Sequence, residues 1–296
     1  MNKDTARFLM CAPNHYAVTY SINPWMDPAT WARNDRMLAT AARREWVALR
    51  RTLLQLGATI ELVPPAAGLP DLVFTANSAV VLDGKALLAR FRHPERAREE
   101  PNYAAAFRAL HARGLIRSVA ELPVGLVLEG AGDCVWDAAR NLFWMGFGQR
   151  SDLAARDVVE DLFGAEVVPL ELADPRFYHV DTALGALPGG ELMYVPGAFT
   201  AAGRAAIAER TTPPQRIAIA DDNAGRLAAN TVCVGDALVM PGCSDDLRHA
   251  LEARGYRVIV VPLPEFLRSG GAAFCLTLRL DRQSAACGAG ARAAVA

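Results

Sequence analysis

The chain has 296 residues, of which 52% are hydrophobic and 21% are charged, and its formal net charge at pH 7 is -1. This size and composition are typical of a globular protein with a large core. The near-zero charge offers no electrostatic attraction to nucleic acid or to an anionic membrane surface. No apolar run approaches the roughly 18 residues that a membrane-spanning helix requires. We therefore expect neither nucleic acid nor a membrane as a partner.

Six cysteines are scattered along the chain, at positions 11, 134, 233, 243, 275 and 287, and none belongs to a Cys-x-x-Cys pair. This spacing argues against a disulfide framework and against a structural zinc site. The apolar stretch at residues 8–11 is too short for the core of a signal peptide. A reducing, cytoplasmic environment fits these features best.

The first predicted elements are a short apolar segment at 8–12, a long helix and a strand. Within the helix, apolar residues recur at spacings of three and four from Leu38 to Leu56. Gly57 provides the expected stop at the C-terminal end of the helix. The strand at 59–63 follows and is closed by two prolines.

This helix–glycine–strand–proline unit recurs along the chain. Its glycines are Gly57, Gly114, Gly164 and Gly255, at intervals of 57, 50 and 91 residues. The last interval is about twice the others, and a degenerate copy at 214–220 lies within it. Five copies of one supersecondary unit are therefore predicted.

Pairs of strands joined by turn residues lie between these units. The predicted pairs are 77–82 with 85–91, 134–136 with 142–146, 183–187 with 191–195, and 231–234 with 237–240. Each repeat is thus strand–strand–helix–strand, and five repeats can bury their faces against one another in a closed ring. The prediction is a single α/β domain at residues 1–283, followed by an Ala- and Gly-rich tail at 284–296 that we expect to be disordered.

Polar residues interrupt the apolar pattern in four places. In the first, Asp71 and Asn77 have the composition of turn or cap residues, so a structural role is open to them. In the second, Glu129 and Asp133 flank glycines after an apolar run. Carboxylates are costly to bury there without partners, which favours a cationic ligand or a histidine partner.

The third and fourth places bring a histidine and a thiol. Two-residue spacing puts His179 and Asp181 on the same face of a predicted strand, although a hydrogen-bonded structural histidine would satisfy the same pattern. Cys275 follows two glycines where a loop leads into a strand. It is either a packed, inert cysteine or a nucleophile whose partners lie elsewhere in the chain.

Two basic residues, Arg96 and Arg150, follow predicted hairpin strands and have the fork geometry that holds a carboxylate. The polar stretches occupy comparable places in different repeats, and in a ring such places converge near the axis. A site with several acids, a thiol, a histidine and arginines at its rim suits a substrate with a cationic head and an anionic tail. An amino acid that carries a guanidinium fits this description.

Four motifs together resemble the guanidine-modifying enzymes: Phe74-Thr-Ala-Asn77, Glu129-Gly-Ala-Gly-Asp133, His179-Val-Asp-Thr182 and Gly270-Gly-Ala-Ala-Phe-Cys275. That superfamily includes arginine deiminases, dimethylarginine dimethylaminohydrolases and amidinotransferases. The resemblance covers residues 8–280 and implies a five-bladed α/β propeller, the pentein fold. Met10-Cys-Ala-Pro, Ile22-Asn-Pro-Trp-Met26 and the first of the four motifs look most similar to the arginine dihydrolases, which convert arginine to ornithine, carbon dioxide and two molecules of ammonia.

The resemblance also implies roles for individual residues. Cys275 corresponds to the nucleophile, His179 to the general acid and base, and Glu129 to the residue that binds the guanidinium and orients the histidine. Asp181 corresponds to a second guanidinium ligand. Arg96 corresponds to the residue that holds the substrate carboxylate.

Three further substrate-binding residues rest on shorter matches. Asp71 corresponds to an acid six residues before position 77 in the dimethylarginine enzymes, Asn23 lies in the dihydrolase-like loop, and Arg150 corresponds to a second arginine of the deiminases. The resemblance implies a small-molecule substrate, arginine or a methylated arginine, and no metal or organic cofactor. No pattern indicates an oligomeric state.

The main departure from the deiminases is Asn77, where those enzymes have aspartate. An amide keeps the shape of the carboxylate, loses its charge and gains two N–H donors. The hypothesis that follows is that the Asn77 NH₂ group bonds the oxygen of a ureido intermediate. Citrulline would then stay bound for a second attack by Cys275.

Several other functions remain open on the sequence. A dimethylaminohydrolase or a deiminase would release citrulline, and an amidinotransferase would transfer the amidine to an amine in preference to water. A non-catalytic propeller that binds an amino acid is the alternative from another class. A papain-like hydrolase is disfavoured by the order Glu129, His179, Cys275 and by the repeats.

Overall fold

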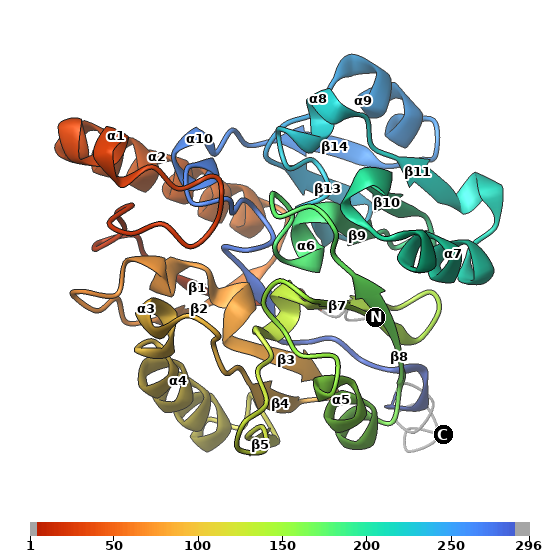
Figure 1. Cartoon of the computed structure of the whole chain (residues 1–296), viewed down its shortest axis with the longest axis horizontal. Coiled ribbons are helices and arrows are strands. Elements are labelled where there is room, and N and C mark those ends of the chain that lie inside the picture. The colour runs from red at the N-terminus through yellow and green to blue at the C-terminus, as the bar shows by residue number, and fades with distance from the viewer. Residues whose placement is uncertain (1–4, 288–296) are drawn as a thin grey trace.

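The computed structural model describes residues 5–287, which form five small three-stranded sheets. The strands lie toward the middle of the molecule and the longer helices at its periphery (Figure 1). In hydrogen-bonded order the sheets are β15 (Leu278–Arg279), β1 (Arg7–Cys11) and β2 (Thr59–Val63); β3 (Ala79–Leu82), β4 (Lys85–Leu88) and β5 (Ser118–Ala120); β6 (Cys134–Asp137), β7 (Leu142–Phe147) and β8 (Glu166–Glu171); β9 (Leu184–Ala186), β10 (Leu192–Tyr194) and β11 (Arg216–Ala218); and β12 (Val232–Val234), β13 (Ala237–Met240) and β14 (Arg257–Val260).

Every sheet has the same internal pattern. The central strand pairs antiparallel with one neighbour and parallel with the strand that follows a helical crossover. The antiparallel neighbour is the preceding hairpin strand in four sheets and the C-terminal strand β15 in the first. The helices are α1 (Pro28–Arg33), α2 (Asp35–Gln55), α3 (Pro94–Ala97), α4 (Glu100–Ala112), α5 (Ala155–Phe163), α6 (Val180–Ala183), α7 (Ala201–Arg210), α8 (Asp221–Ala224), α9 (Asp245–Glu252) and α10 (Pro264–Leu267). The predicted strand–strand–helix–strand repeat is therefore confirmed in five copies.

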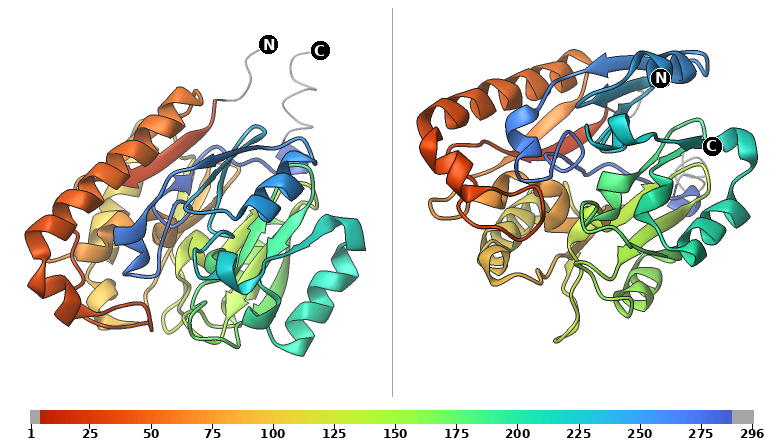
Figure 2. Two further views of the ribbon diagram at one scale, coloured as in Figure 1. Left: turned by 90° about the horizontal axis from the view of Figure 1, so that it is seen from above. Right: turned by 45° about the horizontal axis from the view of Figure 1, so that its top comes forward.

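The long helix α2 shows why the sequence pattern worked. The apolar residues at spacings of three and four form its buried face, and Asp35 lies in the first turn, where its charge complements the helix dipole. Gly57, with φ of +85°, adopts the left-handed conformation that ends the helix. The helix packs along the outside of the first sheet (Figure 2).

The first sheet joins the two ends of the described chain. Strand β15 pairs antiparallel with β1, with Phe8 opposite Arg279 and Leu9 opposite Leu278. The Arg7 N–H also donates to Asp281 Oδ1 at 2.7 Å, across 274 residues of sequence. The sheet is thus complete only when a segment from each end is in place.

The predicted strand that carried His179 and Asp181 is wrong. His179 has extended backbone just before α6, and Asp181 is the second residue of that helix. Asp133 Oδ1 accepts a hydrogen bond from the Val180 N–H at 3.0 Å, which satisfies a free donor at the helix start. The two residues therefore do not share the face of a strand, and His179 contacts Glu129 whereas Asp181 contacts Cys275.

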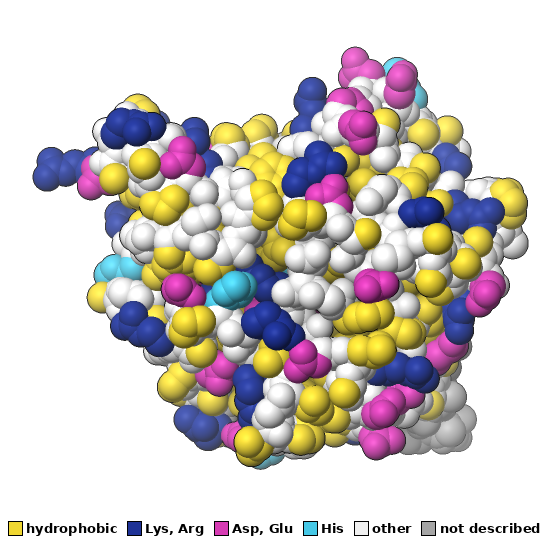
Figure 3. Space-filling view, viewed as in Figure 1, with side chains coloured by type: hydrophobic (Ala, Val, Ile, Leu, Met, Phe, Trp, Pro, Cys, Tyr) yellow, Lys and Arg dark blue, Asp and Glu magenta, His cyan; other side chains and the backbone are white. Residues whose placement is uncertain are grey.

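The predicted tail begins with an ordered contact. The Ser284 hydroxyl donates to Asp83 Oδ2 at 2.7 Å, and the Ser284 N–H donates to Asp83 Oδ1 at 2.8 Å. Residues 288–296 of that tail lie outside the described residues. On the face shown in Figure 3, side chains of both charge signs are interspersed. Within residues 5–287, no helix is both long and apolar enough to cross a membrane.

Candidate active site

Buried polar residues stand just before the first strand of several sheets. Asn77 and Asn230 each precede their strand by two residues, Asp181 and Cys275 by three, and Asp133 by one. All five are buried. The repeat therefore brings chemically different side chains from separate sheets to equivalent positions.

One cluster surrounds the thiol of Cys275. Its Sγ lies 3.0 Å from Asp181 Oδ2 and 3.0 Å from Asn230 Nδ2. Burial raises the pKa of the Cys275 thiol well above its usual value, and the Asp181 charge raises it further. Burial also raises the pKa of Asp181 to about 7. In the free protein this arrangement favours a thiol that donates its proton to the carboxylate.

A second cluster surrounds His179. Its Nε2 lies 2.7 Å from Glu129 Oε2, and its Nδ1 lies 3.4 Å from Asn77 Nδ2. Asn77 Oδ1 accepts from Arg96 Nη1 at 2.7 Å, so the NH₂ group of the amide must face the histidine. His179 Nδ1 is then the acceptor, and Nε2 carries the proton that is donated to Glu129.

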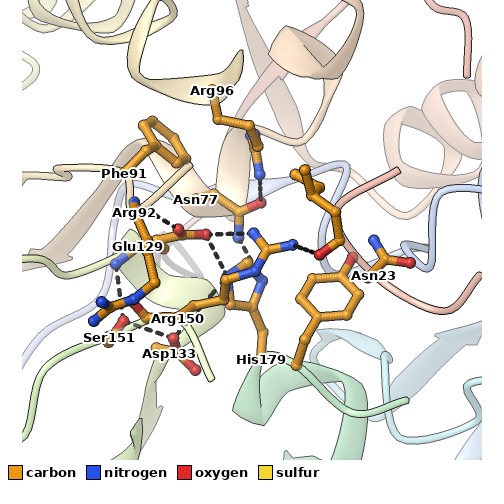
Figure 4. A network of polar contacts seen from close by, with 12 residues as sticks. Asn23, Asn77, Phe91, Arg92, Arg96, Glu129, Asp133, Arg150, Ser151 and His179 are labelled. Carbon is orange, nitrogen blue, oxygen red and sulfur yellow. Dashed lines mark hydrogen bonds and ion pairs between the residues drawn. The ribbon is translucent and has the colours of Figure 1, made fainter. Parts of the chain in front are cut away.

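Glu129 lies between basic groups (Figure 4). Arg150 Nη1 is 3.0 Å from Glu129 Oε2, and His179 lies against the same oxygen. The backbone N–H of Arg92 donates to Oε1 at 3.1 Å. Burial alone would raise the pKa of Glu129, but Arg150 and His179 outweigh burial and hold that pKa well below its usual value. Glu129 is therefore an ionised carboxylate in a completely buried position.

Arg96 is buried and largely occupied by protein partners. Its Nε and Nη2 donate to the two oxygens of Glu99 at 3.0 and 2.8 Å, and its Nη2 also lies 3.3 Å from the Asp71 carbonyl. With the bond to Asn77, four of the five N–H groups of the guanidinium have partners among the described residues. Arg96 was expected to hold a substrate carboxylate, but most of its N–H donors bind Asn77 and Glu99.

Asp71 and Asn23 connect the N-terminal loop to the site. Asp71 Oδ2 accepts from the Tyr20 hydroxyl at 2.7 Å, while Oδ1 has no partner among the described residues. Burial raises the pKa of Asp71. Asn23 Nδ2 donates to the Ser269 carbonyl at 3.0 Å, and Asn23 Oδ1 accepts from the Trp25 N–H. Asn23 therefore ties this loop to the cysteine loop through its side chain.

Glycines let the segments of the site approach closely. Gly270 has φ of +77°, and a Cβ at Gly271 would lie 2.5 Å from the Phe74 ring. A Cβ at Gly132 would overlap the Asn77 amide. The Ala76 N–H donates to the Cys275 carbonyl at 3.1 Å, which joins the cysteine loop to the segment that carries Asn77. Gly271 and Gly132 require glycine because a side chain would displace the Phe74 ring or the Asn77 amide.

The structure thus arranges the predicted residues as two linked groups. Cys275 and Asp181 form one, Glu129, His179, Asn77, Arg96 and Arg150 form the other, and Asp71 and Asn23 lie in contacts at the N-terminal loop. Sequence analysis missed Asn230 and Glu99. The repeat itself could have indicated Asn230, because it is the polar residue that precedes the fourth hairpin. Glu99 lies three residues after Arg96, a spacing at which helical side chains pair.

Comparison with known proteins places the chain in a family. The family model for eukaryotic N,N-dimethylarginine dimethylhydrolase matches residues 16–282. The chain is 37% identical over 278 residues to the N(G),N(G)-dimethylarginine dimethylaminohydrolase of Mycobacterium tuberculosis, covering 93% of this chain and 86% of the relative. It is 42% identical over 274 residues to the bifunctional arginine dihydrolase/ornithine cyclodeaminase AgrE of Nostoc sp., covering 93% of this chain but 38% of AgrE.

A solved structure shows the same fold. The substrate-bound N-terminal domain of ArgZ, a cyanobacterial arginine dihydrolase, superposes with a TM-score of 0.86 at 40% identity, covering 94% of this chain and 99% of that domain. This likeness confirms the predicted pentein architecture. The chain spans only 38% of the length of the bifunctional relatives AgrE and ArgZ. On the extent of the family match and the identity to the mycobacterial enzyme, the chain belongs to the dimethylarginine dimethylaminohydrolase family.

Proposed function

We propose that the chain is a cysteine-dependent hydrolase of the guanidinium of free L-arginine, and specifically an arginine dihydrolase. Arginine and two molecules of water would give ornithine, carbon dioxide and two molecules of ammonia. The observation that carries this proposal is the orientation of Asn77, whose NH₂ group faces His179 because Arg96 holds its oxygen. The similarity to AgrE and ArgZ supports the same activity.

In the first half of the reaction, the guanidinium lies against the carboxylates of Asp181 and Glu129. Its charge favours ionisation of the buried Cys275–Asp181 pair, because a nearby cation stabilises both anions. The proton lost by the thiol is taken up at Nδ1 of His179. The thiolate attacks the guanidinium carbon, and His179 returns the proton to the departing nitrogen as ammonia leaves.

The product of this attack is a covalent thiouronium on Cys275. His179 Nδ1 removes a proton from the water that attacks the thiouronium carbon. The carbon–sulfur bond then breaks and leaves citrulline, with His179 protonated for the next round. Glu129 keeps the ring in place and stabilises the imidazolium, because it stays ionised at 2.7 Å from Nε2.

In the second half, the ureido oxygen of citrulline accepts from the Asn77 NH₂ group. The Cys275 thiolate attacks the ureido carbon, His179 protonates the second ammonia, and a thiocarbamate remains on the sulfur. Water releases this group as the carbamate of ornithine, which decomposes to ornithine and carbon dioxide. An aspartate at position 77 would repel the ureido oxygen, so citrulline would leave after the first half.

The remaining predicted residues complete the pocket in this proposal. Asp71 has a buried carboxylate oxygen without a hydrogen-bond partner in the part of the chain that the structure describes, and this oxygen can accept from the amino group of the substrate. Arg150 and the Arg96 N–H that has no partner within residues 5–287 are available to a substrate carboxylate, and Asn23 ties the N-terminal loop to the cysteine loop. The six cysteines, none of them in a disulfide within residues 5–287, support a reducing cytoplasmic location.

A dimethylarginine dimethylaminohydrolase is the second candidate, because the matching family model carries that name. The reaction would stop at citrulline and release dimethylamine. The same first half applies, and only the leaving group and the fate of citrulline differ.

Product analysis tests the proposal. The purified protein is incubated with L-arginine, and citrulline, ornithine and ammonia are quantified over time, beside Cys275→Ser and Asn77→Asp. We expect ornithine with two molecules of ammonia per arginine from the parent protein, no product from Cys275→Ser and citrulline from Asn77→Asp. Citrulline alone from the parent protein would refute the dihydrolase and the role of Asn77. Turnover of dimethylarginine in preference to arginine would select the second candidate.

A further inference from the structure

Asn230 is a buried residue beside the thiol, and none of the roles above includes it. It lies between α8 and β12 and is 0% exposed. Its Nδ2 donates to Cys275 Sγ at 3.0 Å and to the Asp181 carbonyl at 3.1 Å. Its Oδ1 accepts from the N–H groups of Phe274, at 2.9 Å, and Cys275, at 3.2 Å. All four hydrogen bonds that the amide can make lie within this cluster.

These contacts fix which way round the amide lies. Backbone N–H groups can only donate, so the oxygen of Asn230 faces them and the NH₂ group faces the sulfur. A thiolate accepts such a bond more strongly than a thiol, because a charged acceptor strengthens the bond. Asn230 therefore favours the ionised form of Cys275, whereas Asp181, also in contact with the sulfur, favours the protonated form.

We propose that Asn230 is a positioning residue that aims the Cys275 sulfur and stabilises its thiolate. The proposal rests on the proposed role of Cys275 as the nucleophile. Asn230 also joins the Asp181 carbonyl in α6 to the backbone of the cysteine loop. One side chain thus sets both the ionisation of the thiol and its position relative to the Asp181 carboxylate.

Two substitutions at Asn230 distinguish the contribution of its NH₂ group from that of the whole amide. Asn230→Asp keeps the shape and an acceptor for the two backbone N–H groups but replaces the NH₂ group beside the sulfur. Asn230→Ala removes the whole amide and serves where the charged variant does not fold. The matched control is Asn223→Asp, a buried asparagine in the same part of the fold whose side chain bonds Ser244, not the thiol.

The readout is the rate at which iodoacetamide alkylates Cys275 in the absence of substrate, followed by mass spectrometry as a function of pH. Because the thiolate is the reactive form, we expect both Asn230 variants to react at least about tenfold more slowly than the parent at a given pH. Asn230→Asp should be the slower of the two, and Asn223→Asp should match the parent protein.

The sign of the change distinguishes this role from a structural one. A side chain that merely packs the loop would, when removed, expose the sulfur and speed its alkylation. An unchanged or faster rate in both Asn230 variants would therefore overturn the proposal. The measurement needs no turnover, so failure of the proposed arginine chemistry would appear separately, as full activity in Cys275→Ser or no parent activity towards arginine.

Discussion

Two buried carboxylates of the site, Glu129 and Asp181, have opposite electrostatic surroundings. Glu129 contacts Arg150 and His179, and its pKa is held well below the usual value although burial opposes this. Asp181 contacts a thiol and an amide, and burial raises its pKa to about 7. The difference shows that burial alone does not decide ionisation. A neighbouring cation does, and in the proposed function the guanidinium of the substrate supplies that cation at Asp181.

Removal of the Glu129 charge should have the largest effect on turnover. Glu129→Gln keeps the hydrogen-bonding shape but leaves the buried Arg150 guanidinium without its carboxylate and His179 without its orienting anion. We expect turnover of arginine to fall roughly 10²–10⁴-fold, measured as kcat/KM for ammonia release. Turnover within a factor of about three of the parent protein would contradict the proposed support of His179 by Glu129.

Arg150→Met removes the cation and leaves the carboxylate. The pKa of Glu129 should rise toward its usual value of 4.5 or above, because burial is then less opposed. A group with a depressed pKa stabilises the folded state above its unfolded pKa and loses this contribution as the pH falls through the window below 4.5. Acid unfolding of Arg150→Met should therefore depend less steeply on pH in that window than acid unfolding of the parent protein.

The control for this measurement is Arg156→Met, because Arg156 forms a largely exposed pair with Glu160. Its acid unfolding should follow the parent curve. If Arg150→Met also follows the parent curve, the ionisation of Glu129 does not depend on Arg150.

Asp181→Asn tests the other carboxylate. A buried acid whose pKa is raised stabilises the folded state fully below its unfolded pKa, and this contribution is lost as the pH rises from 3.8 to about 7. The amide has no such loss, so at about pH 8 the Tm of Asp181→Asn should exceed that of the parent protein by at least about 3 °C. This Tm difference should shrink at lower pH. We also expect Asp181→Asn to lose activity towards arginine. A constant Tm difference between about pH 5 and pH 8 would contradict the raised pKa of Asp181.

The smallest expected effect comes from Ser151→Ala. The hydroxyl of Ser151 donates to Asp133 Oδ2 at 2.6 Å and accepts from the Glu129 N–H at 3.0 Å. Its loss leaves two buried partners unsatisfied and should lower the free energy of unfolding by about 1–3 kcal/mol, measured by urea denaturation. We expect kcat/KM to change less than about fivefold. A loss as large as that in Glu129→Gln would place Ser151 in the chemistry.

The sequence predicted the fold because each repeat carries its own local signals. Gly57, Gly114, Gly164 and Gly255 all have positive φ where a helix ends, so the same conformational need marks four of the five copies. The spacing of apolar residues likewise predicted the buried face of α2. Such features depend on neighbours in the sequence, and pattern analysis captures them.

The errors and omissions depend on contacts between distant segments. Asp133 starts helix α6 from 47 residues away, so the conformation of His179 could not be inferred from its neighbours. The hydrogen bond from Arg96 to Asn77 likewise depends on the way two segments fold together. Side chains that share a site were predictable by position in the repeat, whereas their pairwise partners were not.

The pairing of β15 with β1 affects the order in which the site residues are brought together. Cys275 stands three residues before β15, and that strand is held by the opposite end of the chain. During synthesis, the segments that carry Asn77, Glu129 and His179 emerge long before the sulfur does. The sulfur that we propose as the nucleophile is therefore positioned last, when β15 pairs with β1. If Cys275 is the nucleophile, a nascent or C-terminally truncated chain would be inactive, and fraying of β1 would displace the segment that holds the thiol.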